Sequence, residues 1–292
     1  WGSKNYLGIN SDIPRSSPVQ VPGTQWNSVS GWRSVVATKT DGTLWAWGNN
    51  ADGHLGLNEP DSLYRSSPVQ LPGTQWSNKT AHANNVTYAI KTDGTLWAWG
   101  YNAQGQLGIN DTITRSSPVQ MPGTQWVEVR GGQYRGIGTK SDGTLWQWGR
   151  HNSGEGGTND KINRSSPYQI PGTQWDPTNI DANLYSNFAA KTDGTLWVWG
   201  WNSHGQLGQN STVDYSSPRQ IPGTQWNDLG IGFYNATATK TDGTLWTWGW
   251  GANGRLGHNN QGIHYSSPKQ IPGTQWQITS STYGGVFALK TP

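Results

Sequence analysis

The 292-residue chain contains no cysteine and one methionine, and only 13% of its residues are charged. The lack of cysteine excludes disulfide bonds and thiolate metal sites, although it says little about the compartment. A formal net charge of +3 is too small and too scattered to favour nucleic-acid binding. No apolar run approaches the roughly 18 residues that a membrane-spanning helix needs. The sequence therefore predicts neither a nucleic-acid nor a membrane partner, and it indicates no particular localisation.

What the chain has instead is 40 glycines and 20 tryptophans, and many of them belong to one repeated motif. Residues 41–48 read Asp-Gly-Thr-Leu-Trp-Ala-Trp-Gly, and close copies begin at Asp93, Asp142, Asp193 and Asp242. Asp-Gly favours a two-residue type I′ turn, in which both central residues have positive φ. The Thr-Leu-Trp-x-Trp stretch after it has the β-branched and aromatic composition of a strand. Both faces of this strand are apolar, so the tryptophans are expected to pack inside a core.

A second motif, Pro-Gly-Thr-Gln-Trp, sets the period of the chain. Its tryptophan stands at positions 26, 76, 126, 175, 226 and 276, which defines six units of about fifty residues. A period of this size is typical of a solenoid, a propeller or an array. Each unit carries about four strand signals and no helical periodicity, which favours the propeller. We therefore predict an all-β fold: a six-bladed β-propeller with four-stranded blades, forming a single domain over residues 1–292.

The two ends of the chain are predicted to share one blade. The last unit stops at residues 288–292, where the other copies continue into Asp-Gly-Thr-Leu-Trp, and Trp1-Gly2 match the end of that same strand. About six residues of the pattern are missing between Thr291 and Trp1. An incomplete strand leaves a sheet edge that can pair with another chain. The sequence thus predicts either flanking residues that restore the strand or self-association through this closing blade.

These motifs resemble the regulator of chromosome condensation repeat, which forms β-propellers. The shared pattern is Asp-Gly-x-Leu-x-x-Trp-Gly followed by Asn-x-x-Gly-Gln-Leu-Gly, as in residues 102–108. The resemblance implies a protein-binding propeller, since family members bind a small GTPase and histones or inhibit β-lactamases. The founding members of that family have seven blades, whereas this chain has six units. Nucleotide exchange in the family uses an inserted wedge, and no unit of this chain carries an insertion.

Residues that could support catalysis do not recur in register. The repeated aspartate of Asp-Gly is explained by turn chemistry, and no base keeps phase with the repeated Ser-Ser-Pro hydroxyls. The histidines are expected to be solvated loop residues at turn positions: His54, His82, His151, His204, His258 and His264. We therefore predict no catalytic residue, no metal site, no cofactor and no enzymatic activity.

The differences between copies are more informative than the constant positions. They fall in the connection after the first strand of each unit and directly after Trp-Gly. Because successive connections of an antiparallel blade alternate between its two ends, both variable sets are expected on one face and both constant turns on the other. The variable residues are rich in aromatic and arginine side chains, which resembles interaction hot spots. The predicted partner-binding residues are Trp32, Arg33, Tyr101, Tyr134, Arg135, Arg150, Tyr185, Trp201, Phe233, Tyr234, Trp250 and Tyr283.

The predicted function is therefore non-catalytic recognition of a protein partner through this variable face. A lectin with exposed aromatics stacking on sugar rings is the alternative, although a lectin needs the same pocket in several blades. A third hypothesis is a light sensor, because Gly31-Trp32-Arg33-Ser34 is similar to the Gly-Trp-Arg-His motif of the plant ultraviolet-B photoreceptor. That family clusters several such motifs, and the match here occurs once.

Overall fold

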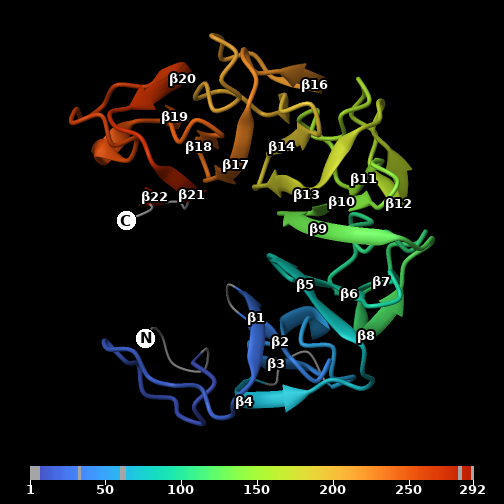
Figure 1. Cartoon of the computed structure of the whole chain (residues 1–292). Helices are drawn as coiled ribbons and strands as arrows, with labels where there is room; N and C mark the ends of the chain where they lie inside the picture. The colour runs from blue at the N-terminus through green and yellow to red at the C-terminus, as the bar shows by residue number, and fades with distance from the viewer. Residues whose placement is uncertain (1–6, 32–33, 60–63, 282–284, 291–292) are drawn as a thin grey trace. The chain divides into compact units, whose positions relative to one another are not determined.

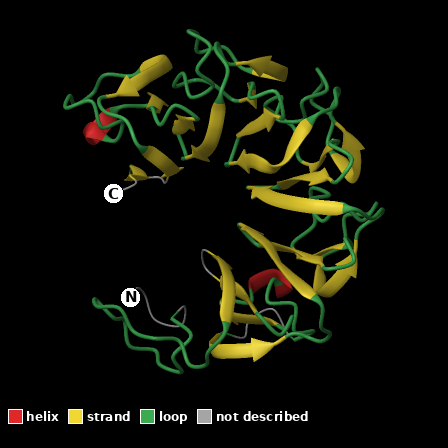
Figure 2. Cartoon of the chain, in the orientation of Figure 1, coloured by secondary structure: helices red, strands yellow, loops and turns green. Residues whose placement is uncertain are grey.

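The computed structural model describes residues 7–31, 34–59, 64–281 and 285–290. Within them the chain forms 22 β-strands and two three-residue 3₁₀ turns, η1 (Ala51–Gly53) and η2 (Ala252–Gly254), so the predicted all-β class is confirmed (Figure 2). No helix in these ranges has the length and apolar character required to cross a membrane.

The chain divides into two compact units. Unit 1 comprises residues 1–141, 146–150 and 163–168, and unit 2 comprises residues 142–145, 151–162 and 169–292. Figure 1 labels most of the strands of both units in chain order.

Unit 1 holds three four-stranded antiparallel sheets, apart from one terminal residue each of β11 and β12. The first sheet consists of β1 (Trp26–Gly31), β2 (Ser34–Lys39), β3 (Leu44–Gly48) and β4 (Arg65–Gln70). The second consists of β5 (Trp76–Ala83), β6 (Val86–Lys91), β7 (Leu96–Gly100) and β8 (Arg115–Gln120). The third consists of β9 (Trp126–Gly132), β10 (Arg135–Lys140), β11 (Leu145–Gly149) and β12 (Arg164–Gln169).

Unit 2 holds two more four-stranded sheets and one of two strands. The fourth sheet consists of β13 (Trp175–Ala182), β14 (Ser186–Lys191), β15 (Leu196–Gly200) and β16 (Tyr215–Gln220). The fifth consists of β17 (Trp226–Ile231), β18 (Asn235–Lys240), β19 (Leu245–Gly249) and β20 (Tyr265–Ile271). The last pairs β21 (Trp276–Ser281) with β22 (Val286–Lys290).

Each sheet starts at the tryptophan of Pro-Gly-Thr-Gln-Trp, and strands consecutive in sequence are neighbours in the sheet. This is the predicted blade, and five four-stranded sheets with a sixth pair of strands are consistent with six blades. Trp1 and Gly2, which were predicted to complete the sixth blade, lie outside the described residues.

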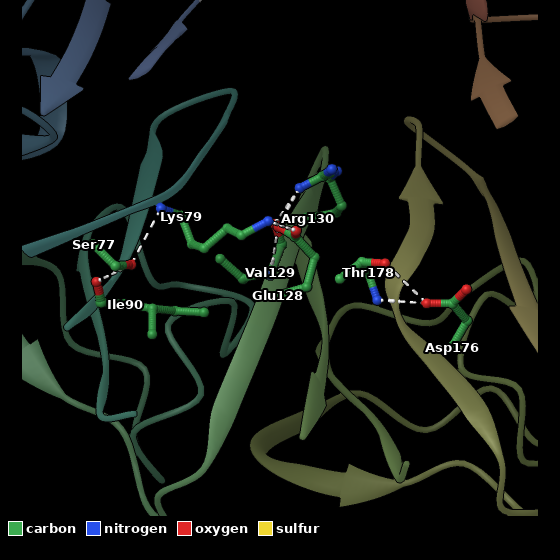
Figure 3. Close-up of polar contacts among 8 residues, drawn as sticks. All are labelled: Ser77, Lys79, Ile90, Glu128, Val129, Arg130, Asp176 and Thr178. Carbon is green, nitrogen blue, oxygen red and sulfur yellow. Dashed lines mark hydrogen bonds and ion pairs between the residues drawn. The ribbon is translucent and has the colours of Figure 1, made fainter. Parts of the chain in front are cut away.

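The first strands of successive sheets contact one another within each unit: β1 contacts β5 and β5 contacts β9 in unit 1, and β13 contacts β17 in unit 2. In unit 1 the Glu128 side chain joins two of them, as Figure 3 shows. Its carboxylate is 2% exposed, accepts a bond from Lys79 Nζ of β5 at 2.7 Å, and pairs with Arg130 of its own strand. A buried carboxylate needs such partners, since losing both would leave an uncompensated charge.

The Asp-Gly connection differs from the predicted type I′ turn. The Lys39 N–H donates to Thr43 O at 3.0 Å and the Gly42 N–H donates to Lys39 O at 3.1 Å, so the loop spans three residues. Gly42 has a left-handed φ of +78°, whereas Asp41 has no positive φ. This is the three-residue hairpin in which a left-handed glycine forms a bulge. The prediction of two positive-φ residues is therefore wrong.

The aspartate of this turn acts within the loop. Asp41 Oδ1 accepts bonds from the Thr43 N–H at 3.0 Å and the Thr43 hydroxyl at 2.7 Å, and Thr43 Oγ1 accepts from Trp45 Nε1. The bonds from Thr43 hold the pKa of the Asp41 carboxyl below its usual value. Asp93, Asp193 and Asp242 repeat the arrangement. The repeated carboxylate thus fixes the turn and orients the first tryptophan of the next strand.

The two tryptophans of Trp-x-Trp-Gly have different surroundings. In β7, Trp97 is partly exposed and Trp99 is 0% exposed. Both pack edge-on against Trp76, with ring centroids 6.1 and 6.3 Å apart. Trp99 Nε1 also donates to His54 O of the preceding repeat at 3.0 Å. The second tryptophan therefore ties each blade to the loop before it, and Trp148, Trp199 and Trp248 repeat this bond.

Candidate functional site

The two variable sets of the sequence lie at the same end of each sheet. Backbone bonds join them in four consecutive repeats: Tyr101 to Asn85, Arg150 to Tyr134, Trp201 to Tyr185, and Trp250 to Tyr234, each N–H donating to the carbonyl at 2.8–3.0 Å. At the opposite end, the Trp226 N–H donates to Gly194 O of an Asp-Gly turn at 3.0 Å. The variable connections therefore lie at one end of each sheet and the Asp-Gly turns at the other, as strand alternation predicted.

The glycine of Trp-Gly makes this close approach feasible. Gly249 has a φ of +96°, and a Cβ at this position would lie 2.4 Å from Tyr234 O. Gly200 has the same geometry, with a Cβ 2.3 Å from Tyr185 O. Only a residue without a side chain lets the two variable loops meet.

A glycine substitution tests this requirement. Gly249→Ala is expected to lower the free energy of unfolding by more than the about 1–2 kcal/mol that a left-handed alanine costs, because its methyl group collides with Tyr234 O. Gly254→Ala is the matched control, since Gly254 has a φ of +72° and no atom of the described residues lies within 4 Å of its Cβ position. Urea denaturation measures both variants. Equal losses would show that the close approach does not constrain residue 249.

In unit 2 the variable residues of two blades gather into one cluster, here called the aromatic surface: Tyr185, Trp201, His204, Phe233, Tyr234 and Trp250. They come from the β13–β14 and β17–β18 connections and from the segments after β15 and β19. All six side chains are partly exposed. Five of these residues were predicted from the sequence to bind a partner, and the sixth, His204, was not.

Tyr234 is the centre of the aromatic surface. Its ring centroid lies 4.2 Å from Phe233, 4.6 Å from His204, 5.1 Å from Trp250 and 5.6 Å from Trp201. Tyr185 extends the cluster, at 5.5 Å from Trp201 and 6.3 Å from Phe233. Edge-to-face contacts at these distances add about 0.5–1.5 kcal/mol per pair beyond burial, so the rings hold one another in place.

Basic groups border the aromatic surface on the Trp250 side. Arg255 is 7% exposed, and its guanidinium lies 4.1 Å from the centre of the Trp250 ring, with its Nε donating to Ala252 O. His264 is exposed, with its ring 6.4 Å from that of Trp250. Burial, with a smaller contribution from His264, lowers the pKa of His204, so the His204 imidazole is neutral near pH 7.

Sequence reasoning missed His204, Arg255 and His264. His204 occupies a third position that differs between copies, where the other repeats carry Asp52, Gln104, Ser153 and Asn253. This variation was a signal of the same kind as the two that were used. Arg255 and His264 follow in the same repeat as Trp250, and only the folded loop brings them to its ring.

In unit 1 the predicted site residues are more dispersed. Tyr101 is partly exposed, and the Arg150 guanidinium lies 5.5 Å from the Tyr134 ring centre. Arg135 is 2% exposed in β10 and lies close enough to Tyr88 to affect its pKa. Its predicted place on the exposed face is therefore corrected, because its side chain points into the packed interior. Trp32, Arg33 and Tyr283 lie outside the described residues.

The histidines also depart from the prediction that all are solvated turn residues. His54 and His151 are 2% and 0% exposed, and His82 lies within β5. The His82 ring contacts Ser34 Oγ at 3.0 Å and Thr87 Oγ1 at 3.1 Å, and it lies 5.7 Å from the His54 ring. Loss of solvation, with a smaller effect of His54, lowers the pKa of His82 to about 3. In the described parts of the chain, no three or more His, Cys, Asp or Glu side chains are placed to hold a metal ion.

Comparison with known families shows to which protein family the chain belongs. The sequence pattern named "Regulator of chromosome condensation (RCC1) repeat" matches residues 41–86, 93–135, 193–228 and 242–287, and a second pattern of that name matches residues 178–206. The chain belongs to the RCC1 repeat family. Its blades are accordingly RCC1 repeats, as the motif resemblance implied. No curated protein sequence matches the chain.

Solved structures share this fold at low sequence identity. Human WBSCR16 is 19% identical with a TM-score of 0.80, over 96% of this chain and 77% of that one. Yeast RCC1 (Prp20), crystallised with Kap60, is 17% identical with a TM-score of 0.80, over 99% of this chain and 75% of that one. Prp20p from Saccharomyces cerevisiae, which binds Gsp1p and histones, is 17% identical with a TM-score of 0.75, over 89% of this chain and 67% of that one. At these identities the likeness shows the RCC1-type β-propeller fold alone.

Proposed function

We propose that this RCC1-repeat chain is a non-catalytic binding protein that recognises a protein partner through the aromatic surface. The observation that carries the proposal is the gathering of six partly exposed aromatic rings from two blades, at positions where the copies differ. Binding hot spots are enriched in tryptophan, tyrosine and arginine, and a few of them dominate the affinity. Yeast Prp20 binds Kap60, Gsp1p and histones, which supports protein binding as the general role.

The chemistry of the aromatic surface favours a partner with apolar side chains. Its six residues carry no carboxylate, and the neighbouring Arg255, which contacts the Trp250 ring, is almost wholly buried. The rings already pack on one another, so little side-chain entropy is lost when a partner binds. These features support recognition. The Ser203 hydroxyl lies 2.8 Å from His204 Nδ1, but among the described residues no carboxylate bonds to the His204 ring to orient it.

The test is an affinity measurement with a partner recovered from an extract of the source organism on the immobilised chain. Trp201→Ala and Tyr234→Ala are each expected to weaken binding by about 2 kcal/mol or more, about thirtyfold, because both lie at the centre of the rings. Gly194→Ala is the control, since Gly194 belongs to an Asp-Gly turn at the opposite end and has a φ of +78°. It is expected to lower stability without changing the affinity of the folded fraction. Weaker binding by folded Gly194→Ala, with Trp201→Ala unaffected, would contradict the proposal.

A further inference from the structure

Two equivalent cavities lie in the fourth and fifth blades, both within unit 2. Their volumes are about 350 and 280 Å³, the first at the lower end of the about 300–1,000 Å³ typical of small-molecule sites and the second just below it. Residues in the same register line both. The first includes Asn159, Pro171, Trp175, Lys191, Trp197 and Ser217, and the second includes Asn210, Pro222, Trp226, Lys240, Trp246 and Ser267. They lie toward the Asp-Gly turns, so they are separate from the aromatic surface.

Each cavity has two indole walls and an ammonium group. In the fourth blade the Trp175 and Trp197 rings meet edge-on at 6.2 Å, and Lys191 Nζ lies 4.9 and 4.8 Å from their centres. In the fifth blade Lys240 Nζ lies 4.6 and 5.2 Å from the corresponding rings. The ion pairs of the described residues do not include Lys191 or Lys240. The aromatic faces orient each ammonium group, and its three N–H donors remain able to bind an anion.

The second observation is a buried donor in the same wall. Trp175 and Trp226 are 1% and 5% exposed, and among the described residues their Nε1 atoms have no hydrogen-bond partner. Leaving a buried N–H unpaired costs about 1–3 kcal/mol. A Cβ placed on Gly172 would lie 3.7 Å from both Trp175 Nε1 and Lys191 Nζ. The two donors therefore converge beside a residue that has no side chain.

We propose that these cavities bind an acidic saccharide. Its carboxylate accepts hydrogen bonds from the lysine ammonium and the buried indole N–H, and the C–H face of its ring packs on the partly exposed second tryptophan. In the fourth blade these groups are Lys191, Trp175 and Trp197, and the Ser217 hydroxyl lines the cavity where a sugar hydroxyl lies. A charge-assisted bond to the carboxylate is about twice as strong as a neutral one, so the acid group directs the specificity.

The same set of groups recurs in all three blades of unit 1, with Lys39 beside Trp26 and Trp45 in the first of them. Lys91 Nζ lies 4.9 and 4.5 Å from the Trp76 and Trp97 ring centres, and Lys140 repeats the arrangement with Trp126 and Trp146. The Nε1 atoms of Trp76 and Trp126 are likewise buried without a partner among the described residues. Repeated weak sites on one chain give avidity for a repeating polymer, which suits a polyuronide.

The proposal is tested on the full chain with three probes: trigalacturonic acid, a neutral galactose trisaccharide, and a glutamate-containing tripeptide. Calorimetry is expected to show trigalacturonic acid binding at more than one site per chain, with tenfold weaker or absent binding of the other two. Assigned indole N–H resonances of Trp175 and Trp226 are expected to shift with the acid sugar. Equal affinity for the neutral sugar, equal affinity for the tripeptide, or unshifted Trp175 and Trp226 resonances at millimolar acid sugar would each overturn it.

Single-site variants locate the binding. Lys191→Met keeps an unbranched side chain over the indoles and is expected to abolish the Trp175 indole shift while leaving that of Trp226. Lys240→Met is expected to give the reverse. Trp201→Ala, on the aromatic surface, should leave both shifts unchanged, so failure of the protein-binding proposal is distinguishable from failure of this one. If Lys191→Met folds, judged by its backbone resonances, and retains the Trp175 shift, the site is wrongly assigned.

Discussion

Trp99→Ala is expected to lower the free energy of unfolding by about 3–5 kcal/mol, the range found when a buried aromatic side chain is truncated. Trp99 is 0% exposed, packs against Trp76, and donates its indole N–H to His54 O. The truncation therefore leaves a cavity and removes one of the hydrogen bonds that His54 O accepts, while the bond from the Thr87 hydroxyl at 2.9 Å remains. Urea denaturation followed by intrinsic fluorescence measures the loss.

Trp97→Ala is the matched control for this prediction. Trp97 stands two residues away on the same strand face and contacts the same Trp76 ring, but it is partly exposed. Its Nε1 donates to Thr95 Oγ1 within its own turn. Its truncation is expected to cost clearly less than that of Trp99, because part of the volume opens to solvent and no bond between repeats is lost. Equal losses of stability in the two variants would show that the buried Trp99 contributes no more to packing than the partly exposed Trp97.

Acid is expected to destabilise the protein from about pH 6.5 downward, well above the range in which carboxylates titrate. The pKa of His82 falls from 6.5 to about 3 in the folded chain. Between these values the unfolded chain binds a proton that the folded chain does not, so stability is complete above pH 6.5 and is lost as the pH falls toward 3. The loss is at most about 1.4 kcal/mol per pH unit, and less because the His82 ring is partly accessible to solvent.

The contribution of His82 is separable by substitution. His82→Gln retains hydrogen-bonding atoms for Ser34 and Thr87 but has no titrating group, so its stability between pH 6.5 and 4 should vary less than that of the parent chain. His264→Gln is the control, since His264 is exposed. Thermal unfolding at half-unit pH steps gives the three slopes. A parent slope unchanged by His82→Gln would place the acid sensitivity on another group.

The propeller blade was predictable because its signals are local and repeat six times. Pro-Gly-Thr-Gln-Trp marks the start of every first strand, and Trp-x-Trp-Gly marks every third strand. The Asp-Gly turn was predicted in the right place with the wrong geometry. Its Thr43 side chain and backbone both bond to Asp41, which favours the three-residue loop. The dipeptide alone does not reveal that competition.

For the candidate site, the sequence predicted the end of each blade at which the variable residues lie. Strand alternation put Tyr234 and Trp250 at one end, and the backbone bond between them confirms it. Both variable positions are evident from the differences between the repeats of this one sequence. His204 also stands at a position that differs between copies, so the same pattern of variation marks it.

The sequence by itself determined the repeat, the strand order and the end of each blade on which differences collect, because these follow from local periodicity. Only the tertiary structure decided that Arg135 is buried, that His82 contacts Ser34 and His54, and that His204 joins the rings, because these surroundings depend on neighbours far away in the sequence. It also decided that the constant Trp175 and Lys191 line a cavity, in which Trp175 Nε1 has no hydrogen-bond partner among the described residues. A residue that packs the core and one that lines a pocket share the same sequence pattern, and only their neighbours distinguish them.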